Sequence, residues 1–175
     1  MERIDKNAKE KFMKEVEKAN SEEYETEWKE GYPISKKKSE VKKGRTSRAK
    51  GARFELRVRH DLESKGRIVN KWNNNIDLEE GNLIIAKRKY NPFSKVMTLG
   101  TGFPDFISIK HVHDGLYSVI GVEVKVNGIL SKIEKEKCVW YLEKGIFSEI
   151  WIAQEKKDGR KIGIEYVDFK ERYME

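Results

Sequence analysis

The chain has 175 residues, a length that suits one ordinary domain with a small appendage. Charged residues make up 38% of it, and the formal net charge of +7 favours anionic partners. The single cysteine, Cys138, excludes an intramolecular disulfide, and no Cys/His cluster has zinc-ligand spacing. No apolar run is long enough for a membrane span and the first residues lack the apolar core of a signal peptide, so we expect a soluble, cytoplasmic protein.

Residues 5–30 carry apolar side chains at the spacing of an amphipathic helix. The resulting stripe is narrow, so we expect this helix to dock on the main domain or on a partner. Gly31-Tyr32-Pro33 ends the pattern, because glycine and proline mark turns. The stripe consists of Ala8, Phe12, Val16, Ala19, Tyr24 and Trp28.

Residues 36–59 carry almost only basic charges, in contrast to the acidic residues 21–30. A local basic stripe is the usual electrostatic footprint of nucleic-acid binding, but a solvated, partly disordered linker has the same composition. The sequence leaves both interpretations open. The side chains expected to contact nucleic acid are Lys42, Lys43, Arg45, Arg48, Lys50 and Arg53.

A second helix is predicted over residues 49–65, followed by a strand over residues 67–72. Phe54, Val58 and Leu62 form the apolar stripe of this helix, and Glu55 falls on its core side. Gly66 suits the C-terminal cap.

The polar residues 73–100 are long for a loop in a compact domain, so we expect a functional insertion with a short strand near Leu83 to Ala86. Lys87, Arg88 and Lys89 add a second basic cluster, whose side chains are further candidates for contacts with nucleic acid.

Residues 105–112 and 116–126 are rich in Ile, Val, Phe and Tyr, and the turn residues His113-Asp114-Gly115 join them. This pattern predicts an antiparallel hairpin. Counting outward from a three-residue loop places Asp105 opposite Glu123, on one face of the sheet.

Lys125 shares the face of Glu123, because side chains alternate along a strand, whereas Val122 and Val124 point to the other layer. Two opposed carboxylates repel each other, so a positive group must lie between them. It is either the Lys125 ammonium in a structural ion pair or a divalent cation bound by Asp105 and Glu123. Carboxylate oxygens favour Mg²⁺, for which Mn²⁺ substitutes.

Pro104-Asp105, followed by Glu123-Val124-Lys125, resembles the PD-(D/E)XK nuclease superfamily. Lys50-Gly51, followed by Glu55, is similar to the KGxxxE opening of archaeal Holliday-junction resolvases, and this resemblance implies that Glu55 joins the metal site. Residues 100–105 (GTGFPD) and 128–131 (GILS) are similar to the VRR-NUC branch, which has a glutamine where this chain has Glu134.

The resemblance implies a restriction-endonuclease-like α/β fold, in which helices 49–65 and 129–144 flank a mixed central β-sheet of about four or five strands. The nuclease domain would occupy residues 46–175, after a helical extension and basic linker at residues 1–45. Glu55, Asp105 and Glu123 would surround the metal, and Lys125 would lie beside the attacking water.

We therefore expect a Mg²⁺-dependent endonuclease that hydrolyses DNA phosphodiester bonds. The resemblance to the resolvases implies a homodimer that cuts branched DNA. A nuclease of the VRR-NUC type acting on flaps or nicks stays open, as does a non-catalytic nucleic-acid-binding module on the same scaffold. A structural protein with an internal lysine–carboxylate network is the remaining alternative.

Overall fold

The computed structural model describes residues 6–85, 88–91, 96–99, 102–159 and 161–174. The chain divides into two compact units, Met1–Lys50 and Gly51–Glu175. Within the described ranges, no helix combines the length and the apolar character needed to cross a membrane.

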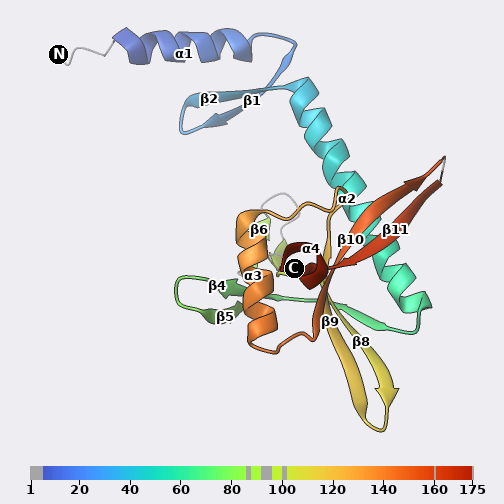
Figure 1. Ribbon diagram of the computed structural model, residues 1–175. Coiled ribbons are helices and arrows are strands. Elements are labelled where there is room, and N and C mark those ends of the chain that lie inside the picture. Colours follow the sequence, from blue (N-terminus) through green and yellow to red (C-terminus); the bar gives the residue numbers. More distant parts are fainter. Residues whose placement is uncertain (1–5, 86–87, 92–95, 100–101, 160, 175) are drawn as a thin grey trace. The chain divides into compact units, whose positions relative to one another are not determined.

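The first unit contains a helix and an antiparallel hairpin, α1 (Lys6–Ala19), β1 (Tyr24–Lys29) and β2 (Tyr32–Lys37) (Figure 1). The helix predicted over residues 5–30 is therefore wrong beyond residue 19. Tyr, Thr and Trp favour strands, and they supply half of the six residues of β1. Glu30 and Gly31 have positive φ angles, which a two-residue hairpin turn requires.

A long helix, α2 (Lys38–Ser64), begins well before the predicted helix at residues 49–65. The basic residues from Lys38 onward are thus helical rather than disordered. Lys, Arg and Ala are good helix formers, which explains why charge alone does not disrupt the helix. Gly66 follows the helix with a φ angle of 75°, and its N–H donates to the Glu63 carbonyl oxygen at 3.0 Å, as predicted for a C-terminal cap.

The second unit is built on a mixed five-stranded sheet in the order β11-β10-β9-β8-β3. Strands β9 and β10 are parallel, and the other neighbours are antiparallel. This arrangement confirms the predicted α/β class with a mixed central sheet. The strands are β3 (Ile68–Lys71), β8 (Phe106–His113), β9 (Leu116–Val124), β10 (Glu149–Asp158) and β11 (Lys161–Asp168).

Helices cover both faces of this sheet (Figure 1). On one face, the predicted stripe Phe54, Val58 and Leu62 of α2 is fully buried against a cluster that includes Val122. The other face packs on α3 (Lys132–Glu143) and α4 (Phe169–Tyr173). Burying each large apolar side chain contributes about 1.5–3 kcal/mol. Since Val122 faces α2, the next residue, Glu123, points to the α3 side.

The insertion at residues 73–100 forms two small hairpins, β4 (Asn74–Asp77) with β5 (Asn82–Ile85), and β6 (Arg88–Asn91) with β7 (Val96–Leu99). Strand β5 confirms the strand predicted near Leu83. Lys87 lies outside the described residues, and Arg88 and Lys89 belong to β6, of which only the backbone is described.

Candidate active site

The central hairpin has the predicted register along its length but a different turn. Phe106 pairs with Val122, so Asp105 and Glu123 occupy the next opposed position. The turn contains two residues rather than three, because His113 itself pairs with Leu116. A register shift between residues 111 and 113 compensates for the missing loop residue and keeps the two acids opposed.

Asp105 and Glu123 bind each other's strand through the backbone. The Asp105 N–H donates to Glu123 Oε2 at 3.1 Å, and the Val124 N–H donates to Asp105 Oδ2 at 3.0 Å. The Asp105 carbonyl oxygen also accepts from the Trp72 N–H at 3.2 Å, which continues the pairing with β3. Both carboxylates are therefore held side by side by main-chain hydrogen bonds, and their positions are as well defined as those of the strands.

Close packing at two glycines shapes this end of the sheet. A Cβ atom at Gly102 would collide with the backbone carbonyl oxygens of Trp72 and Asn74. Only glycine therefore fits at this position before Asp105. At Gly121 a Cβ atom would lie 2.8 Å from Pro104 Cγ. Gly102 thus allows the chain before Asp105 to pass close to Trp72 and Asn74, and Gly121 allows the close approach of Pro104 to β9.

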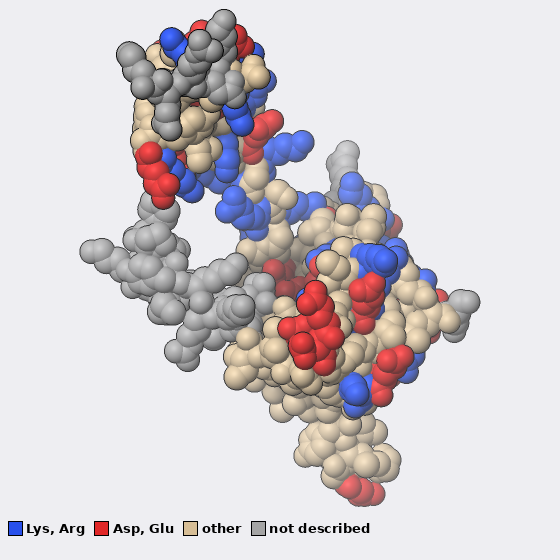
Figure 2. All heavy atoms as spheres, turned by 90° about the vertical axis from the view of Figure 1, so that its left-hand side faces the viewer, with Lys and Arg blue, Asp and Glu red and all other residues tan. Residues whose placement is uncertain are grey.

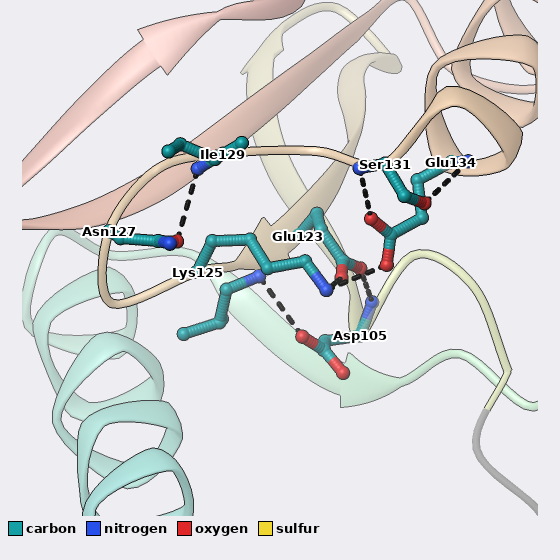
Figure 3. A network of polar contacts seen from close by, with 8 residues as sticks. Asp105, Glu123, Lys125, Asn127, Ile129, Ser131 and Glu134 are labelled. Carbon is teal, nitrogen blue, oxygen red and sulfur yellow. Dashed lines mark hydrogen bonds and ion pairs between the residues drawn. The ribbon is translucent and has the colours of Figure 1, made fainter.

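Lys125 lies just beyond the end of β9, and its backbone N–H still donates to the Ala153 carbonyl oxygen at 2.9 Å. Its ammonium lies between two carboxylates, 3.1 Å from Glu123 Oε1 and 2.7 Å from Glu134 Oε1 (Figure 3). Lys125 and Glu123 therefore share one face, as predicted. Glu134, at the start of α3, is an additional partner that sequence reasoning did not foresee.

Burial dominates the electrostatics of the two acids. Glu123 is 4% exposed, and burial together with the charge of Asp105 raises its pKa to about 8. Burial also raises the pKa of Asp105, and the charge of Glu55 adds to the effect. Burial by itself lowers the pKa of Lys125, but hydrogen bonds and charges of Glu134 and Glu123 outweigh it and raise the pKa. The ammonium stays charged without neutralising the pair of acids.

Glu55 approaches the site from the α2 side and is bound to a second lysine. Its Oε2 atom lies 2.6 Å from Lys71 Nζ, and this ammonium also lies over the Phe106 ring, 4.7 Å from the centroid. Glu55 is close enough for its charge to act on Asp105. Lys71 was missed in the sequence, although it lies two residues after the buried Val69 and so interrupts the apolar face of β3.

The predicted nucleic-acid contacts on α2 are exposed side chains, namely Lys42, Lys43, Arg45, Arg48, Lys50 and Arg53. Arg45 is paired with Glu25 of β1, with 3.4 Å between Nη2 and Oε1. A shallow groove of the first unit is lined by lysine and hydroxyl side chains alone. These are Ser39, Lys42, Lys43, Thr46, Ser47 and Lys50.

The carboxylates that the structure describes around the site do not by themselves make up a set of metal ligands. Among the residues that the structure describes, no three His, Cys, Asp or Glu side chains are grouped so that they could hold a metal ion. The donor set at hand is the opposed pair Asp105 and Glu123, with Glu55 and Glu134 each bound to a lysine.

A scan against protein-family models finds no match, and no curated protein or solved structure matches the chain.

Proposed function

We propose that this chain is a divalent-metal-dependent nuclease that hydrolyses DNA phosphodiester bonds. One observation carries the proposal: Asp105, immediately before β8, lies opposite Glu123 of β9, with the Lys125 ammonium 3.1 Å from Glu123. This is the arrangement expected for the PD-(D/E)XK resemblance. The central sheet between α2 and α3 is compatible with the restriction-endonuclease-like core that the resemblance implies.

The donor set fits a magnesium or manganese ion. These ions are bound in proteins by one or two carboxylates together with water and substrate phosphate oxygens, and the opposed pair supplies two carboxylates. The raised pKa values of Asp105 and Glu123 reflect negative charge that burial penalises and that one ammonium does not offset. A divalent cation would remove this penalty. When bound, it would supply Lewis-acid polarisation of the phosphate and a more acidic water.

Lys125 would act as a fixed positive charge during hydrolysis. A water oxygen attacks phosphorus and gives up a proton to solvent, the bond from phosphorus to one ester oxygen breaks, and that oxygen takes a proton from solvent and leaves as a hydroxyl. Negative charge develops on the phosphate oxygens during this step. The Lys125 side chain is 28% exposed and so can reach substrate, and its raised pKa suits electrostatic stabilisation rather than removal of a proton from water. Asp105 and Glu123 would orient the phosphate and the attacking water, because backbone hydrogen bonds fix the positions of the two carboxylates.

Basic side chains along α2 would bind the phosphate backbone of DNA. Lys and Arg side chains are spread over the surface that Figure 2 shows, and the exposed ones of α2 include Lys42, Lys43 and Arg48. The groove lined by Lys42, Lys43 and Lys50 with serine and threonine hydroxyls offers donors that suit phosphate oxygens. Such contacts give affinity without sequence preference and weaken as salt is added. The resemblance to the resolvases makes branched DNA, bound by a homodimer, the leading substrate.

The test is metal-dependent cleavage of labelled DNA in the form of a four-way junction, a flap, a nicked duplex, a plain duplex and a single strand. We expect wild type to cut with Mg²⁺ or Mn²⁺, and Asp105→Asn, Glu123→Gln and Lys125→Ala each to abolish cutting while DNA binding is retained. Lys132→Ala, which removes an exposed lysine on α3, is the control and should cut like wild type. Symmetric cuts in the junction would indicate resolvase activity. Cutting confined to flaps or nicks would indicate a nuclease of the VRR-NUC type.

A non-catalytic nucleic-acid-binding module is the second candidate. It is favoured by the ion pairs of Lys71 with Glu55 and of Lys125 with Glu134 and Glu123, which give three of the four carboxylates a lysine partner from within the chain. Salt-sensitive binding of DNA by folded wild type, with no cleavage of any substrate in either metal, would support this module and refute the nuclease.

A further inference from the structure

Lys125 interacts with two carboxylates at unequal distances. Its Nζ atom lies 2.7 Å from Glu134 Oε1 and 3.1 Å from Glu123 Oε1 (Figure 3). All three side chains are at most 28% exposed, so solvent only partly screens these contacts. Glu134 is thus the nearer of the two carboxylates to the ammonium.

The Glu134 carboxylate is fixed independently of Lys125. Its Oε2 atom accepts from the Ser131 N–H at 2.7 Å, and the Glu134 N–H donates to Ser131 Oγ at 3.3 Å. These two bonds form the capping box that starts α3. One carboxylate oxygen therefore serves the helix, which leaves the other directed at the ammonium of Lys125. A glutamate used only as a cap does not need this second contact.

The second contact matters because the ammonium and a divalent cation would compete for Glu123. If Lys125 had Glu123 as its nearest partner, a cation would have to displace the ammonium before binding Glu123. With Glu134 in place, the ammonium retains a carboxylate partner when Glu123 binds a cation. With all groups ionised, Asp105, Glu123, Glu134 and Lys125 together carry two negative charges, which matches a divalent cation.

We propose that Glu134 is a positioning residue that retains the Lys125 ammonium beside the site and leaves Glu123 available to a divalent cation. This role rests on the proposed nuclease function and assigns to Glu134 a task beyond capping α3. It also explains why glutamate, rather than glutamine, suits this position: only a carboxylate gives the ammonium a charged partner.

Glu134→Gln is the discriminating variant, because glutamine also supports a capping box and keeps an oxygen for the Ser131 N–H. Ser131→Ala is the matched control, because it removes the capping hydroxyl but retains the carboxylate that faces Lys125. Mn²⁺ binding to each full-length protein is measured by electron paramagnetic resonance, and folding by thermal unfolding. We expect Mn²⁺ affinity to fall about 10-fold or more in Glu134→Gln, as for other residues that orient metal ligands, and to change little in Ser131→Ala.

A second measurement needs wild type alone. The side-chain ¹⁵N signal of Lys125 is followed by NMR as Mg²⁺ is added, and we expect the ammonium to remain protected from exchange, since Glu134 still holds it. Loss of that protection would overturn the proposal, as would unchanged Mn²⁺ affinity in folded Glu134→Gln or equal losses in both variants. These outcomes leave the nuclease proposal standing. Absence of Mn²⁺ binding to wild type would instead refute the nuclease itself, and this role with it.

Discussion

Glu123→Gln is expected to stabilise the protein at alkaline pH and to leave it almost unchanged at acidic pH. Burial and the charge of Asp105 raise the pKa of Glu123 from its ordinary 4.5 to about 8. An acid with a higher pKa in the folded state binds more protons when folded. The free energy of unfolding of wild type therefore decreases as pH rises from about 4.5 to about 8.

The size of this effect follows from the same interval. At about 1.4 kcal/mol per pH unit, the difference between 4.5 and about 8 corresponds to about 5 kcal/mol of unfolding free energy. Glutamine does not ionise and so avoids this loss. Its carbonyl oxygen can still accept from the Asp105 N–H, and Lys125 keeps Glu134 as its partner. The variant should thus retain the packing of the site.

The assay is urea-induced unfolding at pH 5, 7 and 9 in buffer that contains a metal chelator. The unfolding free energy of Glu123→Gln minus that of wild type should increase by up to about 4 kcal/mol from pH 5 to pH 9, because a small part of the effect is already present at pH 5. Glu136→Gln removes an exposed glutamate of α3 and should follow wild type. If the difference in unfolding free energy between Glu123→Gln and wild type stays constant across this range, the raised pKa of Glu123 is refuted.

Two further predictions concern the backbone and the basic helix. Gly102→Ala should destabilise the protein by several kcal/mol in thermal unfolding, because its Cβ atom would collide with backbone carbonyl oxygens, whereas Gly51→Ala in open space within α2 should stabilise it by about 0.5–1 kcal/mol. Replacing Lys42 and Lys43 together by alanine should weaken DNA binding and reduce the slope of log affinity against log salt by about 2, measured by fluorescence anisotropy. Lys161→Ala, on β11, is the control, and an unchanged slope in the double variant would exclude the α2 groove from binding.

The periodicity of apolar residues was sufficient to predict the central elements of the second unit. A helix or strand with one buried face needs apolar residues at the spacing of that helix or strand. The stripe of Phe54, Val58 and Leu62 is buried as the helical spacing predicted. The same reasoning failed for β1, where Tyr24 and Trp28 have helical spacing by coincidence. Trp28 is 60% exposed, so its position in the sequence is not governed by a core, and spacing then carries little information.

The opposed acids could be predicted because strand register is a matter of counting, although the turn itself was wrong. Neither lysine–glutamate pair could be read from the sequence. Lys71 lies sixteen residues from Glu55, and Lys125 nine residues from Glu134, in different elements of secondary structure. Which of several nearby acids a flexible lysine binds depends on distances of a few tenths of an ångström, and these are set by the packing of α2 and α3 on the sheet.

The energetic cost of the acids bears on why the hairpin carries them. A purely structural network of Lys125 with Asp105 and Glu123 would be expected to stabilise the ionised acids and lower both pKa values, as its Lys125 contact lowers that of Glu134. The pKa values of Asp105 and Glu123 are raised instead, so at neutral pH the pair opposes folding. Isosteric replacement of either acid should therefore cost the fold little. Buried carboxylates that lower the stability of a protein are characteristic of binding or catalytic sites. A divalent cation is a ligand whose charge would offset this loss of stability.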